Sequence, residues 1–188
     1  MNLEHLGRHS IRLKGYDYAS AGAYFITVCT YDRQCLFGEI AGGAMYLNET
    51  GQAISDEWLR TAAVRRYVTL DEFVLMPNHI HGIMILTEAT VVQHHVRKDR
   101  KGVGANRRLA PTASTPPSAG SIGAIMSQFK SITTKRINGM LGTTGTSVWQ
   151  RNYYEHVIRS DIELYEIREY IQNNPTRWDE DSENPIHR

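Results

Sequence analysis

Two apolar segments, residues 68–76 and 79–87, are separated only by Pro77 and Asn78. Both segments are rich in β-branched and large apolar residues, which is typical of strands. Because proline lacks a backbone N–H, the Pro-Asn pair interrupts the strand and forms a turn. Such a short connection leaves the two strands adjacent and antiparallel. We therefore predict a β-hairpin at this position.

The other periodic segments add strands and helices to this hairpin. Apolar residues that recur three or four positions apart predict helices, and short β-branched or alternating runs predict strands. For the first helix Asn48 and Thr50 are candidate caps, and for the last helix Ser160 and Asp161. In chain order we predict a strand at 24–31, a turn-like segment or short hairpin at 36–46, a helix at 49–65, a helix at 121–139, a strand at 153–159 and a helix at 161–175.

The order of these elements predicts the fold class. Strand, helix, strand, strand, helix and strand form the split βαβ pattern. We expect an α+β fold, a ferredoxin-like antiparallel sheet with helices on one face, plus an added C-terminal helix. A chain of 188 residues is long enough for one core and short for two. We therefore expect a single domain over residues 1–188, with a flexible basic insert at about 88–120.

Charge and composition indicate the cellular compartment of the protein, but they do not identify its activity. The net charge is only +1, but basic residues gather between positions 97 and 136 and acidic ones between 161 and 183. Such a basic segment is compatible with phosphate binding or with an ordinary solvated loop. No secretory or membrane-spanning apolar run is present in the sequence. We expect a cytoplasmic protein with no membrane partner and with reduced Cys29 and Cys35.

His79 and His81 begin the second strand of the predicted hairpin. Residues two apart in a strand point to the same face, so the two imidazoles can bind one divalent cation. A pair of polar residues at a sheet surface is the alternative. Histidine-triad nucleotide hydrolases need a third alternating histidine, but position 83 is Ile. Metallo-β-lactamase-like hydrolases need HxHxDH, but Gly82 and Ile83 follow His81.

The predicted last helix, DIELYEIREYIQNNP, carries Tyr170 and Asn174 one turn apart on one face. A phenol is a weak nucleophile at neutral pH, but a divalent cation on a target phosphate can activate the reaction. Tyr170 is therefore a candidate nucleophile or a core residue with its hydroxyl at the rim. Asn174 is a candidate oxygen ligand for the same cation. We expect much of the packing surface of this helix to come from Ile162, Tyr165, Ile167 and Ile171.

With these residues in view, the chain resembles the HUH-type single-strand nucleases, and more closely the REP-associated tyrosine transposases. The resemblance runs through nearly the whole chain, in the blocks YFITVCTYDR, VLMPNHIHGIMIL, SQFKSITTKRIN, WQRNYYEHVIR and EYIQNNP. A lone HIH is weak, whereas these blocks in this order are specific. The basic insert at 88–120 is the least typical part.

The resemblance implies a metal-dependent endonuclease and strand-transferase acting on single-stranded DNA. His79 and His81 match the metal-binding histidines, and Tyr170 matches the nucleophile. Asn174 matches the third metal ligand, with Gln172 and Asn173 as alternatives. The implied cofactor is Mg²⁺ or Mn²⁺ without a nucleotide. The implied partners are hairpins of palindromic repeats, which implies a protein associated with the nucleoid. The implied cleavage proceeds through a 5′-phosphotyrosine intermediate and is carried out by a monomer or homodimer.

Basic and aromatic residues are candidates for holding the DNA. Phosphates attract cationic side chains, and unpaired bases stack on aromatic rings. Each candidate has an ordinary surface role as its alternative. The DNA-binding candidates are Lys14, Tyr16, Lys130, Lys135, Arg136 and Arg151.

Two other functions remain open. A catalytically silent single-stranded nucleic-acid-binding protein would keep the fold without covalent chemistry, since ferredoxin-like sheets often bind RNA through surface aromatics. A metal-dependent hydrolase of small phosphoesters would use the histidines but not Tyr170.

Overall fold

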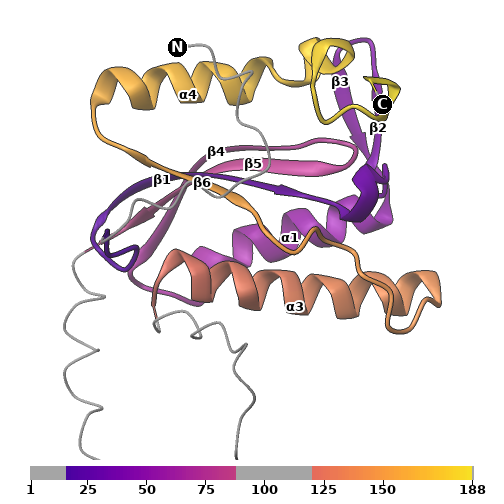
Figure 1. Cartoon of the computed structure of the whole chain (residues 1–188), viewed down its shortest axis with the longest axis horizontal. Coiled ribbons are helices and arrows are strands. Elements are labelled where there is room, and N and C mark those ends of the chain that lie inside the picture. Colours follow the sequence, from indigo (N-terminus) through magenta and orange to yellow (C-terminus); the bar gives the residue numbers. More distant parts are fainter. Residues whose placement is uncertain (1–15, 88–119, 188) are drawn as a thin grey trace, which may run out of the picture.

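The computed structural model describes residues 16–87 and 120–187, and its core is a four-stranded antiparallel sheet (Figure 1). The order of the strands across the sheet is β4-β5-β1-β6. Neighbours in the sheet are therefore not always neighbours in the chain, as the split βαβ pattern requires. The predicted α+β, ferredoxin-like fold is confirmed. The strands are β1 (Gly22–Cys29), β4 (Val68–Leu75), β5 (His79–Leu86) and β6 (Tyr154–Ile158).

Helices cover both faces of this sheet. Figure 1 shows α1 (Glu49–Ala63) and α3 (Ile122–Leu141) together on one face and α4 (Asp161–Asn173) alone on the other. A separate hairpin consists of β2 (Gly38–Ala41) and β3 (Ala44–Leu47). Three short 3-10 helices complete the described elements: η2 (Tyr31–Arg33), η3 (Pro175–Glu180) and η4 (Pro185–His187).

The alternation of side chains along β1 divides the interior into two cores. Tyr24, Ile26 and Val28 belong to the larger core, which includes residues of α1 and α3. Phe25 belongs to the smaller core, which includes Ile167 and Ile171 of α4. Because successive strand residues point to opposite faces, a single strand supplies both cores.

Side-chain caps set the starts of the three α-helices in the described part of the chain. The side chain of Asn48 accepts a hydrogen bond from the Gly51 N–H, and Ser160 caps α4 in the same way. These are residues that the sequence offered as candidates. Ser121 caps α3, which ends at Gly142 in the left-handed conformation, with φ 67°.

Two details of the prediction were wrong. The first strand ends at Cys29, not at residue 31, because Tyr31 begins η2, in which Asp32 has a left-handed φ of 56°. On α4, Ile162 and Tyr165 are 73% and 62% exposed. Leu164, Ile167 and Ile171 pack on the sheet instead, since that spacing of three and four follows the helical repeat.

The predicted basic insert lies outside the described residues except for Gly120. Within the described ranges, none of the helices combines the length and apolar character that a membrane span requires.

Gly82 on β5 allows Trp58 of α1 to lie directly against the sheet. A Cβ at position 82 would lie 2.5 Å from Trp58 Cζ2, closer than real side chains approach. Gly82→Ala should therefore lower the free energy of unfolding by about 1–3 kcal/mol. Gly139→Ala on α3 is the matched control, because nothing lies within 4 Å of its Cβ position. It should stabilise the protein by up to ~1 kcal/mol. Equal urea midpoints for the two variants would contradict this account.

Candidate active site

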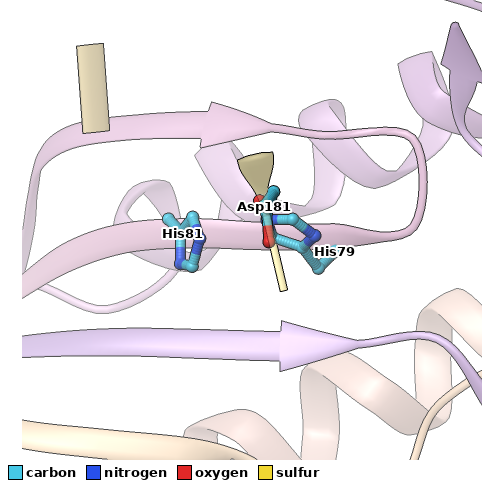
Figure 2. Close-up of side chains that lie close together, drawn as sticks. All are labelled: His79, His81 and Asp181. Atoms are coloured by element: carbon cyan, nitrogen blue, oxygen red, sulfur yellow. The ribbon is translucent and has the colours of Figure 1, made fainter. Parts of the chain in front are cut away.

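His79 and His81 lie side by side on the face of β5 that α4 covers. His79 is fully buried and His81 is 4% exposed. Their ring centroids are 4.5 Å apart. Figure 2 shows both rings on one strand, with Asp181 beside His79. The two imidazoles therefore lie on the same face of β5, as the sequence predicts.

The side-chain amide of Asn78 determines which ring nitrogen of His79 carries the hydrogen. Asn78 Nδ2 donates to the carbonyls of Arg33 and Glu183, at 3.0 and 2.7 Å, which turns Oδ1 toward His79 Nδ1 at 2.8 Å. Because Oδ1 only accepts, Nδ1 carries the hydrogen. Burial, aided by the charge of Arg33, lowers the pKa of His79 to about 3. The ring is therefore neutral, and its Nε2 has a free lone pair.

Asp181 lies against this lone pair, although no local pattern of the sequence points to this residue. Its Oδ1 accepts the Glu183 N–H at 2.7 Å, and its Oδ2 lies 3.6 Å from His79 Nε2. Both Oδ2 and Nε2 are buried without a hydrogen-bond partner. Two acceptors that face each other repel, and burial removes the water that would otherwise satisfy them. A cation between them would satisfy both.

The donor set fits a divalent metal ion. One ligand atom each of His79, His81 and Asp181 lies within 4.8 Å of the other two. Two imidazole nitrogens and a carboxylate oxygen suit Mn²⁺ and other first-row ions, and a carboxylate also suits Mg²⁺. Burial, with the neighbouring His79, lowers the pKa of His81 well below its usual value, so both imidazoles are neutral, the form that binds a metal ion.

His81 joins this cluster to Tyr170. Its Nδ1 lies 2.7 Å from the Thr27 hydroxyl, and its Nε2 lies 3.3 Å from the Tyr170 hydroxyl. Phe25 packs beside both rings, with centroids 5.5 Å from His81 and 6.0 Å from Tyr170. Thr27 and Phe25 thus hold the two side chains in one arrangement from the neighbouring strand β1.

Tyr170 is protonated in this environment. Burial, together with the charges of Asp181 and Glu183, raises the pKa of its phenol to about 12, and a hydrogen bond with the Asn174 side chain opposes this rise. Nucleophilic chemistry at neutral pH therefore requires a change in the local charge.

Asn174 lies beside the phenol, at the end of α4. It is 5% exposed, and its Oδ1 is a third buried acceptor without a partner. The two alternatives to Asn174, Gln172 and Asn173, are exposed, and the Asn173 amide donates to the carbonyl of Glu169. Of these three residues, Asn174 has the side chain placed toward the tyrosine.

The basic DNA-binding candidates of α3 lie away from this cluster, because α3 covers the opposite face of the sheet (Figure 1). Lys130 Nζ donates to the carbonyls of Gln150 and Arg151. Arg136 contacts the Ala53 carbonyl and Asp56 of α1. Lys135 and Arg151 are exposed.

Of the two N-terminal DNA-binding candidates, only Tyr16 lies within the described residues. Tyr16 is half-buried, with its ring centroid 5.0 Å from that of Tyr18. Lys14 lies outside the described residues.

An ion pair fixes α4 over the sheet. The Arg168 guanidinium donates to both carboxylate oxygens of Asp71 on β4, at 2.7 and 2.5 Å. This bond holds the pKa of Asp71 below its usual value. The pair lies less than one helical turn from Tyr170, so it contributes to the position of the phenol.

Comparison with known proteins identifies relatives and a shared fold. No protein-family model matches the chain. An uncharacterised protein of Haemophilus influenzae is 41% identical over 179 residues, which is 93% of this chain and 91% of that protein. The structure is also similar to that of a REP-associated tyrosine transposase bound to a REP hairpin. The TM-score is 0.51 and the identity 18%, over 84% of this chain and 68% of the other. The chain therefore has the fold of a tyrosine transposase.

Binding of Mn²⁺ should raise the melting temperature of the wild-type protein. At one hundred times the Kd, the stabilisation should be about 2.7 kcal/mol. His79→Ala should remove this response. Asp181→Asn should also weaken it, yet leave the metal-free protein as stable or more stable, because the new amide can donate to His79 Nε2.

The exposed neighbour Asp179→Asn provides the control for these metal titrations. Its response to Mn²⁺ should equal that of the wild type. A full response in Asp181→Asn would show that Asp181 is not a ligand.

Asp71→Asn should lower the free energy of unfolding at pH 7, since it removes the pair with Arg168. The folded-state pKa of Asp71 is lowered, so the pair contributes fully above the unfolded pKa of ~4. The contribution is lost as the pH falls through the folded-state pKa. Urea titrations should therefore show the wild type and the variant converging at low pH. Glu166→Gln, at an exposed position of α4, should show no such dependence; parallel curves for Asp71→Asn would contradict the assignment.

Proposed function

We propose that this chain, which belongs to the same family as the uncharacterised Haemophilus influenzae protein, cleaves and rejoins single-stranded DNA with Tyr170 as nucleophile. The observation that carries this proposal is the Tyr170 hydroxyl, 3.3 Å from Nε2 of His81, beside a cluster of buried acceptors that lack partners. A reactive oxygen and a cation site next to each other are what a metal-assisted phosphoryl transfer needs.

In the proposed reaction the Tyr170 oxygen attacks the phosphorus of a phosphodiester. The bond from phosphorus to the 3′ oxygen breaks, which leaves a 5′-phosphotyrosine and a 3′-hydroxyl. The phenol gives up its proton, and the departing 3′ oxygen gains one. In the reverse step a 3′-hydroxyl attacks the phosphotyrosine and expels Tyr170, so strands can be rejoined without a nucleotide cofactor.

His79, His81 and Asp181 would hold a divalent metal ion, with Mg²⁺ and Mn²⁺ as the candidates. When bound, the ion supplies a positive charge that polarises the phosphate and favours the ionised phenol. Asn174 also favours ionisation of the phenol, because its hydrogen bond lowers the pKa of Tyr170. Its unpartnered Oδ1 is available as a further oxygen ligand. Thr27 orients His81 by its bond to Nδ1.

For the substrate we propose hairpins formed by palindromic repeats, bound by one domain that spans the chain and acts as a monomer or homodimer. Two observations support this class. The blocks of sequence around His79 and Tyr170 resemble those of the REP-associated tyrosine transposases. The transposase that shares the fold was solved with a REP hairpin bound.

Wild-type protein incubated with labelled single-stranded repeat hairpins and Mn²⁺ should form a covalent adduct that survives a denaturing gel. Tyr170→Phe should abolish the adduct, since phenylalanine has no nucleophilic oxygen. His79→Ala should reduce adduct formation by about 10²-fold or more, because it removes electrostatic stabilisation of the transition state. Tyr165→Phe, on the exposed side of the same helix, should retain wild-type yield.

The other outcomes separate the competing functions. Metal-dependent cleavage that persists in Tyr170→Phe would identify a hydrolase that uses activated water. Tight binding of the hairpin with neither cleavage nor adduct would identify a silent single-stranded nucleic-acid-binding protein.

A further inference from the structure

We infer that a groove between α3 and residues 145–151 binds the phosphate backbone of the DNA that flanks the cleaved bond. This inference rests on the proposed function and adds to it a second DNA-binding site. The groove lies beside α3, on the face of the sheet opposite to Tyr170. The groove has a volume of about 480 Å³ and is open to solvent. Lys130, Lys135 and Arg151 line it, and none of the described residues that line it carries a carboxylate.

The lining suits phosphate better than bases. Besides the three cations, α3 contributes Ser131, Thr134 and Asn138, whose hydroxyl and amide groups can donate to phosphate oxygens. The one aromatic residue of the lining, Trp149, is 5% exposed, so its ring is not free to stack on a base. Contacts of this kind position a strand without reading its sequence.

The groove is held in shape by hydrogen bonds between its two walls. Asn138 Nδ2 donates to the Thr146 carbonyl at 2.8 Å, and Trp149 Nε1 donates to the Thr133 hydroxyl at 2.8 Å. Lys130 Nζ donates to the carbonyls of Gln150 and Arg151, which leaves one of its three N–H bonds for a ligand. A site that is already ordered loses little entropy when it binds.

The position of the groove relates it to the candidate active site. The Gln150 N–H donates to the Cys29 carbonyl at 3.0 Å, and Cys29 is the register partner of His79. Two spacings between strands separate Gln150 from His79, or ~10 Å. At a rise of ~3.4 Å per nucleotide, about three nucleotides span that distance. Because the groove and the metal cluster lie on opposite faces of the sheet, a strand that occupies both passes around the sheet at residues 149–151 and needs more than these three nucleotides.

The test measures hairpin binding in EDTA, where cleavage cannot interfere, over a range of salt concentrations. Lys135→Glu and Arg151→Glu should each weaken the Kd at least tenfold at low salt. Each should also reduce the salt slope, by about 0.9 for a duplex contact or 0.7 for a single-strand contact. Comparing the repeat hairpin with an unpaired strand of the same composition shows which part of the DNA occupies the groove. Each variant should lose the same factor in affinity for a hairpin of scrambled sequence as for the repeat hairpin, because phosphate contacts do not read the bases.

Arg60→Glu is the matched control, because it makes the same charge change at an exposed position of α1 outside the groove. It should leave the Kd and the salt slope as in the wild type. All three variants should keep the wild-type melting temperature and its response to Mn²⁺, which excludes unfolding and loss of the metal cluster.

The two proposals fail in different ways. Variants at Lys135 and Arg151 that bind like Arg60→Glu, in a protein that still forms the Tyr170 adduct, would overturn the groove and leave the proposed function intact. A wild-type protein that neither binds the hairpins nor forms an adduct would overturn both.

Discussion

The side-chain amide of Asn78 joins three parts of the chain that are far apart in sequence. It donates to the carbonyl of Arg33 in η2 and to that of Glu183 near the C-terminus, and it accepts from His79. These bonds bring the segment that carries Asp181 against β5. They also fix the hydrogen of His79 on Nδ1, so that its free lone pair meets the Asp181 carboxylate. The candidate metal cluster therefore depends on a residue that is not itself a ligand.

The two faces of the four-stranded sheet differ, because one holds the larger core and the other holds the candidate active site. Its α1 and α3 face holds the larger core, where Trp58 lies so close to Gly82 that no Cβ fits. Its α4 face carries the paired histidines and Tyr170 over a smaller core. Since β5 has His79 and His81 on one face and Ile80 and Gly82 on the other, the core holds the candidate active-site face in place.

Local patterns predicted the parts of the site that lie within one element. The period of two placed His79 and His81 together, and the helical period placed Tyr170 and Asn174 together. Asp181 was missed because it reaches the site through tertiary hydrogen bonds, which no local spacing encodes. The error at Ile162 and Tyr165 has a related cause: α4 has apolar residues on more than one side, and only contact with the sheet decides which side is buried.

From the sequence, Tyr170 is either a core residue with its hydroxyl at the rim or a nucleophile. The electrostatics of the site are compatible with both roles in one residue. With only protein groups around it, the phenol is held protonated by burial and by the charges of Asp181 and Glu183, and its pKa is about 12. Those same carboxylates would repel a DNA phosphate. A cation at the cluster would offset their charge, separate the facing lone pairs of His79 and Asp181, and favour the ionised phenol. In the proposed reaction, binding of the metal ion therefore also activates the nucleophile, and Tyr170 stays protonated until the ion is bound.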